Sequence, residues 1–471
     1  MQRRDAVAQL PDAMARVPGA PWALILVAIA SLAAPAGVEA QVPEGASERG
    51  GEVQELTPER AVRLGLEASP RVRAAESEAA AARARHREAR GGLLPVLAAQ
   101  GGYTRLGGDL PDDLEFTIPG LDQTFSILPI ERDRYTTELS FEQPLFTGGR
   151  LRNIARAAER GASAAEQMAD QARADVALEI QSAYWRLHGG LAALDAVNGA
   201  VALMEEHVQH MLRRYEEGLV LRSELLAAQT RRSEVALERV EAENGVRVAR
   251  LELNRLLGLP AVAEPRLVGT VPQEPLVTEL DVLVEEGLAS QAHLQAMADE
   301  VGARRAQAAV ARGARLPDLS LVSRYVYARP NPYVFTEQTS FRGTWEAGVA
   351  VRWSLFQGGA QLARESEAAA QLRAAEARLQ EAREMAAVEV ARHYLEAQRA
   401  WEAVEVAALN VEQAAEGLRV TREQFEEGVV LSSQVLEAER AYREAQARAA
   451  RTDAELGLGQ AALRHALGRV W

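Results

Sequence analysis

The chain has 471 residues, of which 48% are hydrophobic and only 5% aromatic, a balance typical of long helices packed side by side. All 53 basic residues are arginine and 67 residues are acidic, so the net charge of -14 leaves no basic footprint for nucleic acid. The lack of lysine also excludes the phosphate-loop motif of ATP-driven motors, because that motif holds the nucleotide phosphates with a lysine.

The N-terminus has the pattern of an export signal, predicted over residues 1–40. An apolar run at 22–34 is followed by a small-residue exit, and a start at Met14 would leave Arg16 as the positive segment. A short buried helix is the alternative interpretation. The absence of cysteine fits an oxidising compartment without disulfides and excludes an N-terminal lipid anchor. No later stretch approaches 18 consecutive apolar residues, so any membrane-spanning part is expected to be β-structure.

The first half of the mature chain, 41–259, is predicted to run from helix to strand and back to helix. Thr57, followed by proline, opens a helical stretch that continues to Gly91. An exposed loop rich in glycine, proline and aspartate separates two strands of alternating polarity. Two long helices with coiled-coil spacing follow and break at Gly218. The strands and the long helices are predicted at about 96–106, 133–146 and 149–257.

The second half, 278–471, repeats this order of elements after a proline-rich linker at 260–277. Its strands again alternate apolar and polar residues, and its long helices again carry an apolar seam, which only Arg422 interrupts. The helix pair breaks at Gly428. The strands and the long helices are predicted at about 318–328, 344–356 and 359–467.

The two halves are copies of one unit. At least fourteen residues between Leu145 and Gly258 recur identically 210 positions later. Before the loops the offset is 222, as Pro95 and Pro317 show, so the first loop is longer by 222 − 210 = 12 residues. The chain is therefore an internal duplication of a helix–strand–loop–strand–helix–turn–helix unit.

Four amphipathic strands are too few to close a barrel in lipid, where an open edge leaves backbone groups unpaired. Three chains would supply 12 strands, a number expected to leave an interior passage. The polar strand faces would line the passage, and the apolar, aromatic faces would meet lipid. The residues expected on the polar faces are Glu138, Glu142, Glu346 and Arg352. Those expected on the apolar faces are Tyr135, Phe141, Trp345, Val349 and Trp353.

Three sets of motifs resemble the TolC-like outer-membrane efflux proteins over about residues 55–468. They are the Leu-Phe-x-Gly-Gly corners at 145–149 and 355–359, the Leu-Pro strand entries, and the Glu-Gly-x-Val-Leu turns. The resemblance implies a mainly α fold with a transmembrane β-barrel. A homotrimer would form a 12-stranded barrel, four strands per chain, continued by a long periplasmic α-helical coiled-coil tunnel with an equatorial region around the linker.

The resemblance also implies a function and partners. Such proteins are passive exit ducts of tripartite efflux or type I secretion systems. They lie in the outer membrane with a large periplasmic part and join an inner-membrane pump of the RND or ABC type through a periplasmic adaptor protein. No cofactor, metal or nucleic acid is implied. The cargo is left open, because drugs, metal ions and polypeptides all leave through ducts of this kind.

The family places the adaptor contact and a closable gate at the helix–helix turns. By resemblance, the contact residues here are Gly218, Leu219, Val220, Ser223, Gly428, Val429, Val430 and Ser433. The gate residues are Glu224, Phe425, Gln434 and Glu437. Three copies of Glu437 would form a ring of like charge that favours cations. Some relatives lock the gate with an arginine and a tyrosine, where this chain has Val430 and Phe425, so closure is expected to depend on apolar packing.

The sequence also bears on a metal site, on catalysis and on a different function. His207 and His210 share a helix face and could hold a metal, although a solvated face is the preferred interpretation. The sequence shows no convincing nucleophile–base pair or paired carboxylates, so no enzyme is expected. The alternative function is a periplasmic coiled-coil scaffold without a pore, which would require strands that remain soluble.

Overall fold

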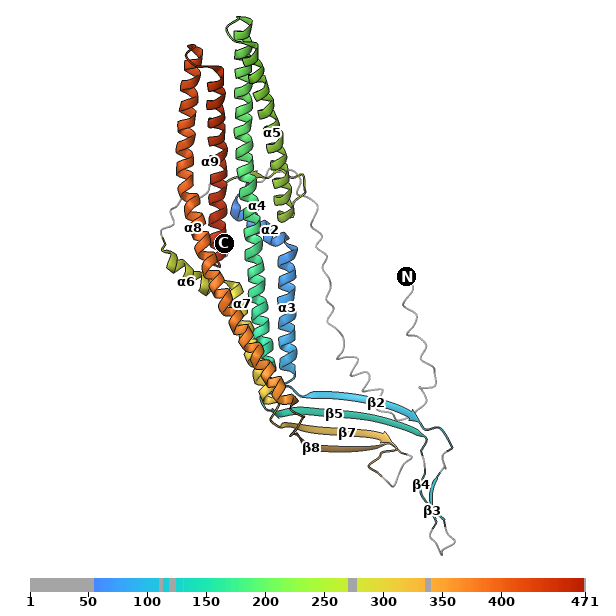
Figure 1. Ribbon diagram of the computed structural model, residues 1–471. Helices are drawn as coiled ribbons and strands as arrows, with labels where there is room; N and C mark the ends of the chain where they lie inside the picture. Colours follow the sequence, from blue (N-terminus) through green and yellow to red (C-terminus); the bar gives the residue numbers. More distant parts are fainter. Residues whose placement is uncertain are drawn as a thin grey trace, which may run out of the picture. The chain divides into compact units, whose positions relative to one another are not determined.

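The computed structural model describes residues 55–109, 113–117, 124–129, 131–269, 278–334 and 340–469 (Figure 1). All of them belong to one compact unit, Gln54–Trp471. The predicted signal peptide lies outside the described residues. Within the unit, long helices and one four-stranded sheet follow each other in the order that the duplication predicts.

Two helices stand where the sequence predicts one helical stretch, α2 (Pro58–Ala68) and α3 (Pro70–Gly91). Thr57 caps α2 as predicted, and its hydroxyl accepts the backbone N–H of Arg60 at 3.3 Å. The break falls at Ser69, whose backbone is extended with φ −67° and ψ 119°. Proline disfavours helical geometry in the residue before it and donates no N–H, so Pro70 starts a new helix. The second half likewise divides into α6 (Leu280–Ser290) and α7 (Ala292–Gly313).

The main sheet is antiparallel in the order β2-β5-β7-β8. Its first three strands begin where the sequence predicts, whereas the fourth ends four residues before the predicted end at 356. The bounds are Val96–Arg105, Asp133–Thr147, Asp318–Arg329 and Arg342–Arg352. Trp353 lies just beyond the ladder, and its indole N–H donates to the carbonyl oxygen of Arg315 at 3.0 Å.

The first loop contains structure that the sequence analysis missed. Two short strands, β3 (Asp113–Thr117) and β4 (Thr124–Pro129), pair antiparallel where an exposed loop was predicted. Its glycine, proline and aspartate content indicated turns, and the two short apolar runs between those turns were overlooked. The 12 residues by which the first loop is longer, 222 − 210, are part of this hairpin region.

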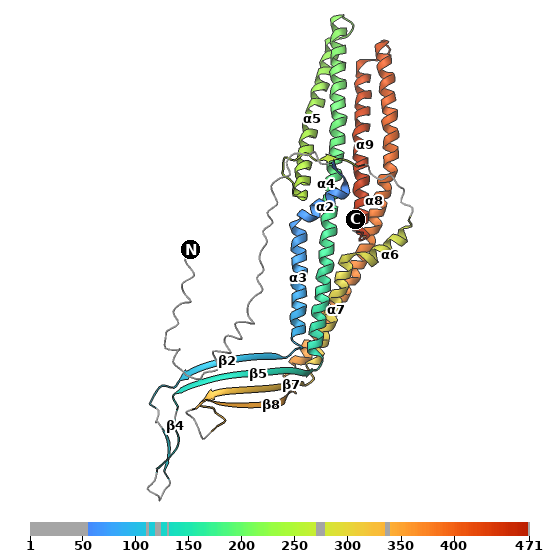
Figure 2. The same cartoon turned by 180° about the vertical axis from the view of Figure 1, so that it is seen from behind.

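Each half carries one long helical hairpin (Figure 2). The first is α4 (Arg150–Glu216) with α5 (Arg222–Leu257), and the second is α8 (Ala360–Glu426) with α9 (Ser432–Ala466). Both α4 and α8 contain 67 residues.

A pair of left-handed glycines turns each strand segment into its long helix. Gly148 and Gly149 have φ values of 59° and 77°, and Gly358 and Gly359 have 59° and 82°. Side chains rarely adopt such angles, which explains the Gly-Gly of both corners.

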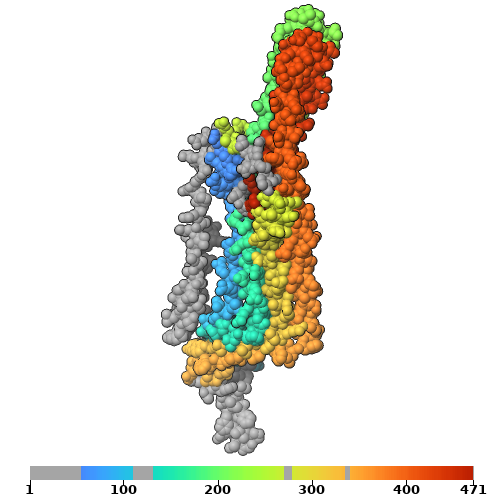
Figure 3. Space-filling model, turned by 90° about the vertical axis from the view of Figure 1, so that its left-hand side faces the viewer, coloured from blue at the N-terminus to red at the C-terminus, as the bar shows by residue number. Residues whose placement is uncertain are grey.

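The helices next to the sheet follow the order of its strands. α3 packs on α4, α4 on α7, and α7 on α8, and Figure 3 shows these four segments side by side from blue to orange. α9 also packs against α4 and so joins the two hairpins. The two lateral edges of this layer are therefore α3 and α8.

The linker between the halves contains an element that was not predicted. β6 (Arg266–Leu267) pairs in parallel with β1 (Glu55–Leu56), which joins the start of the first half to its end. A predicted linker of 260–277 is therefore ordered in part, and 270–277 lies outside the described residues.

The largest core cluster surrounds Tyr184 on α4, which is fully buried. Its hydroxyl donates a hydrogen bond to the carbonyl oxygen of Leu56 at 3.1 Å, and burial raises its pKa to about 12. Nearby, α9 approaches α4 so closely that a Cβ on Gly457 would lie 2.4 Å from the Trp185 ring. One 18-residue window of α4 reaches a mean hydropathy of 1.3, enough for a membrane span by composition. Only 22% of that window is buried within the chain, against the helices α3, α5, α7 and α9 that pack on α4.

Candidate functional site

The main sheet has one polar face, and ion pairs cross it. Arg324 on β7 contacts Glu138 on β5 at 3.0 Å and Glu346 on β8 at 3.7 Å. The cross-strand register places Glu138 opposite Gln100 and Val326, so these residues share a face. Three strands are thus linked by charges on the side that the alternation assigns to a passage.

The opposite face is apolar and aromatic. Tyr103 and Tyr135 lie with ring centroids 5.0 Å apart on neighbouring strands. Trp345 is 77% exposed, and Val349 and Val351 on the same strand are exposed as well. A continuous exposed face of this kind is costly in water and favourable in lipid, with aromatic rings enriched at the boundary. The predicted division of the strands into two faces is confirmed by the register.

The sheet has two free edges. In the described part of the chain, β2 pairs only with β5, and β8 pairs only with β7. Both strands therefore offer a row of backbone groups to another chain. Within a membrane these groups require partners, because lipid supplies none.

The two helix turns, 217–221 and 427–431, have the same geometry. Gly218 and Gly428 have φ values of 73° and 78°, in the left-handed region. The next N–H in each turn donates back to the last helical turn, Leu219 to the Arg214 carbonyl and Val429 to the Gln424 carbonyl, both at 2.8 Å. This pattern ends a helix sharply and requires glycine, which the sequence analysis predicted.

The expected adaptor residues divide into an outer and an inner group. Leu219 and Val429 are 62% and 69% exposed at the ends of the turns. Ser223 and Ser433 are also exposed, one on each returning helix. Val220 and Val430, in contrast, are partly buried and pack on the apolar cluster beneath. The turns therefore present small and apolar groups outward, beside the exposed Glu217 and Glu427, above a packed base.

The expected gate residues do not lie together in one chain. Gln434 and Glu437 are exposed on α9, and Glu224 is half-buried on α5. The Gln434 side chain accepts the backbone N–H of Leu431 at 3.3 Å, so it caps its own helix. Phe425 is buried, with only 7% exposed, and packs inside the chain.

Phe425 joins the two hairpins. Its ring lies 5.9 Å from that of His210 and 6.2 Å from that of His207, and the Arg214 guanidinium sits over it at 4.8 Å. The Arg214 side chain also donates to the Phe425 carbonyl oxygen at 3.0 Å. The sequence analysis did not anticipate Arg214, because its partner is a backbone atom of the other half.

His207 is buried between the hairpins, and its Nε2 lies 3.3 Å from the hydroxyl of Ser432. Burial, together with the charges of Arg422 and His210, lowers its pKa to about 4. Within the described ranges, no group of three or more histidine, aspartate or glutamate side chains is arranged to hold a metal. The histidine therefore acts in this structure as a neutral packing residue.

A layer of charged residues lies next to this cluster, farther from the turns. Glu439, only 6% exposed, accepts from Arg422 at 2.7 Å, and Arg443 pairs with Glu238 of the other hairpin. Burial raises the pKa of Glu439, which Arg422 partly offsets. The interruption of the apolar seam by Arg422 was the sequence signal for this layer, because a charged side chain in a helix seam favours a carboxylate partner.

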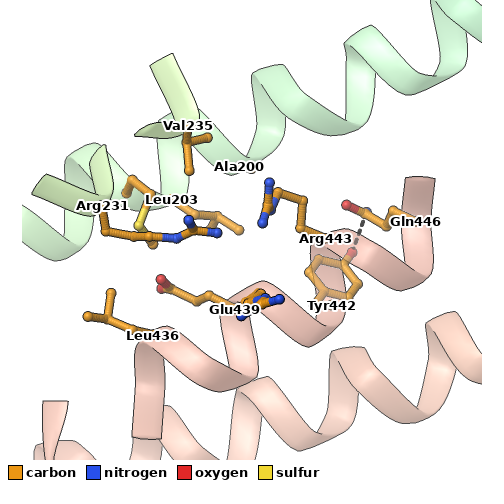
Figure 4. A pocket seen from close by; sticks show the side chains of 11 residues that line it. Ala200, Leu203, Arg231, Val235, Leu436, Glu439, Tyr442, Arg443 and Gln446 are labelled. Carbon is orange, nitrogen blue, oxygen red and sulfur yellow. Dashed lines mark hydrogen bonds between the residues drawn. The ribbon is translucent and has the colours of Figure 1, made fainter. Parts of the chain in front are cut away.

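A pocket of about 20 Å³ opens between the hairpins beside Glu439, large enough for a single water molecule. Figure 4 shows Arg231 and Val235 from one hairpin and Arg443 from the other along its walls. The Oε2 atom of Glu439 is buried without a hydrogen-bond partner among the described residues. The interface between the two hairpins is therefore small and polar here, and one of its buried carboxylate oxygens lacks a hydrogen bond among the described residues.

Comparisons with known proteins agree with this architecture. The family model for the outer membrane efflux protein matches residues 61–259 and 283–469. No curated protein shows significant sequence similarity to the chain.

Solved structures share the fold. The outer-membrane channel OprN is 20% identical with a TM-score of 0.73, and the match covers 88% of this chain and 90% of that one. The outer membrane protein VceC of Vibrio cholerae is 21% identical with a TM-score of 0.73, covering 87% and 96%. The Campylobacter jejuni CmeC outer membrane channel is 16% identical with a TM-score of 0.73, covering 87% and 85%. At these identities the structures establish the fold alone.

The family model covers both halves of the duplication, and the sheet has the two faces that an outer-membrane strand requires. The chain therefore belongs to the outer membrane efflux protein family and is an outer-membrane exit channel with a large periplasmic helical part.

Proposed function

We propose that three copies of the chain form the passive exit duct of a tripartite efflux or type I secretion system. The observation that carries this proposal is a four-stranded sheet with an apolar face and two free edges. Pairing β8 of one copy with β2 of the next would satisfy both edges, and three copies would close a barrel of 3 × 4 = 12 strands. The passage would be lined by the Glu138–Arg324–Glu346 face.

The helical turns are the proposed contact for a periplasmic adaptor, which would connect the duct to an inner-membrane pump of the RND or ABC type. Exposed apolar groups at Leu219 and Val429 favour this assignment, since they lie at the turns without partners among the described residues. Ser223 and Ser433 flank them, and Gly218 and Gly428 shape the turns. Apolar tips of this kind fit a docking surface better than a solvated end.

The gate is proposed to depend on packing rather than on a polar lock. Phe425, Val430 and Val435 share one buried cluster with Met211 and Leu225 of the first hairpin. The exposed Glu437, in three copies, would contribute a ring of negative charge at the tip. Glu224 and Gln434 complete the proposed gate.

Cell fractionation tests the duct against the scaffold without a pore. The duct is expected with the outer membrane and as a trimer in mild detergent. Recovery as a soluble monomer would contradict the duct and favour the scaffold. Reconstituted trimers should also conduct ions in a planar bilayer, a property that no scaffold has.

A further inference from the structure

A groove of about 370 Å³ lies between α4 and α7, close to the corner where strand turns into helix, and four arginines line it. They are Arg156 and Arg160 on α4 and Arg305 and Arg312 on α7. The other lining residues are Asn153 and the small or apolar residues Ala298, Val301, Gly302, Ala306 and Ala309. No acidic side chain is among them, in a chain whose net charge is -14.

The contacts between α4 and α7 show where each of these arginines lies along the helix axes. The two helices run antiparallel, because a Cβ on Gly148 would touch Gly313 while one on Gly302 would touch Arg160. In an antiparallel pair the residue numbers of two facing positions have a constant sum. Here 148 + 313 and 160 + 302 give a sum of about 461. By this rule Arg156 and Arg305 face each other across the groove, and Arg312 lies at the end next to the strands.

Two of the four guanidinium groups are without partners in the described part of the chain. Arg160 pairs with Asp299 at 2.8 Å and Arg305 with Glu376 at 3.2 Å. Arg156 and Arg312 are exposed and have no ion pair or hydrogen bond there. An arginine fork presents paired donors that match phosphate oxygens, so the two unpaired groups are suited to an anion with phosphate geometry.

The groove also stays open when copies assemble at the edges of the helical layer. Its two walls are the middle helices of the order α3-α4-α7-α8, so neighbouring copies meet α3 and α8 instead. In the proposed trimer the groove therefore lies away from the lateral contacts between copies.

The place of the groove indicates which anion it takes. A collar of exposed apolar residues surrounds the corner at the end of the sheet and marks the membrane boundary: Leu94, Leu145, Phe146, Leu316, Leu355 and Phe356. Arg156 lies seven residues beyond Gly149, or about 10 Å along the helix. The polar headgroup layer of a bilayer is roughly 5–8 Å thick on each side, within reach of a long arginine side chain at that level.

We propose that this groove binds the phosphate groups of an anionic phospholipid from the inner leaflet of the outer membrane. Arg312 binds phosphate oxygens at the membrane end, and Arg156, opposite Arg305, binds them about two turns farther. The small side chains of Ala298, Ala306 and Ala309 leave room for the glycerol backbone. A lipid with two phosphates, such as cardiolipin, spans both levels and binds more tightly than one with a single phosphate. The inference rests on the proposed outer-membrane duct.

Lipid retention by the purified, full-length trimer tests the proposal. Native mass spectrometry would count bound cardiolipin, phosphatidylglycerol and phosphatidylcholine on the parent protein, the double variant Arg156→Gln/Arg312→Gln and a control. The control, Arg213→Gln/Arg232→Gln, removes the same charge from two exposed arginines near the turns. We expect the groove variant to lose at least tenfold in apparent affinity for cardiolipin, and the control to match the parent.

Three outcomes would overturn the proposal: an equal loss in the control, equal retention of phosphatidylcholine, or competition by millimolar inorganic phosphate as effective as that by lipid. The last would indicate a site for a free anion. A lysine variant, Arg156→Lys/Arg312→Lys, retains charge without the paired donors and is expected to bind weakly, while its trimer remains intact. The lipid measurement starts from isolated trimers. If the proposed duct is wrong, no such trimers are recovered in the fractionation experiment, so the two proposals fail in different experiments.

Discussion

The guanidinium of Arg214 on the first hairpin holds the carbonyl oxygen of Phe425 on the second, at 3.0 Å, and covers its ring at 4.8 Å. The equivalent of Phe425 in the first half is Tyr215, at 425 − 210, and this tyrosine is 40% exposed. Two positions related by the duplication thus have different environments. Only the one in the second half fastens the hairpins to each other.

Replacing Phe425 with alanine is expected to loosen the tip. Phenylalanine-to-alanine changes in packed cores cost roughly 3–5 kcal/mol, and here the lost contacts belong to both hairpins. Trimers should persist, because the sheet and the lower helices do not contact this residue, while single-channel conductance in planar bilayers should rise. Tyr215→Ala is the matched control and should have a smaller effect. Equal conductance in the two variants would contradict the role assigned to Phe425.

Acid should weaken the same contact through His207. Its pKa is lowered from 6.5 to about 4 in the folded chain, so the unfolded chain binds the proton more readily. Protonation of His207 therefore lowers the free energy of unfolding. The loss develops as the pH falls from about 6.5 towards 4 and amounts to roughly 3 kcal/mol for a full shift of this size.

Hydrogen exchange of the tip segments measures this pH dependence. Protection factors around His207, which correct for the slower intrinsic exchange at low pH, should fall below pH 6.5, and His207→Gln should remove most of that change. Glu439 changes the free energy of unfolding in the opposite direction. Its pKa is raised by burial, so its protonation at low pH stabilises the folded chain. A His207→Gln chain with undiminished acid sensitivity would assign the effect to other groups.

The ion pair of the partly exposed Arg422 with the buried Glu439 should behave asymmetrically on mutation. Arg422→Leu leaves a carboxylate buried without its cation and is expected to cost about 3–5 kcal/mol. The double variant Arg422→Leu/Glu439→Leu removes both charges and should recover most of that loss. Thermal unfolding of the trimer, followed by circular dichroism, provides the double-mutant cycle. Additive losses in the cycle would show that the two side chains are not coupled.

Gly428→Val should impair export while trimers still reach the outer membrane. At a φ of 78° a β-branched residue is strained, by about 1–2 kcal/mol, so the turn must change shape. Gly428→Asn is the control, because asparagine tolerates the left-handed region. An efflux assay in intact cells together with trimer gels on isolated membranes measures both quantities. Unchanged export with valine would refute a role for this turn.

Periodicity and duplication were sufficient to predict the sheet, its two faces and the long hairpins. A period of two, as along β5 and β7, indicates a strand with two different faces. The three-four spacing along α4 and α8 indicates a helix with one apolar face. Repetition also predicted the glycine turns, because Gly218 and Gly428 occur at corresponding positions.

Contacts between the halves were harder to predict. Arg214, Ser432 and Glu238 meet partners more than 200 residues away, and the sequence carries no spacing rule for such pairs. The β3–β4 hairpin was missed for a local reason, since its turn residues outnumber its short apolar runs. The interruption at Arg422 was noticed in sequence, but only the fold identifies Glu439 as its partner.

The equal length of α4 and α8, 67 residues each, restricts how this duplicated chain can evolve. An insertion of one heptad into α4 alone would shift its turn along the axis by about 10 Å and leave the other turn behind. If the proposed adaptor binds both turns, it would tolerate only insertions that occur in pairs. The two halves can therefore diverge widely in sequence, as Tyr215 and Phe425 have, while their long helices must grow or shrink together.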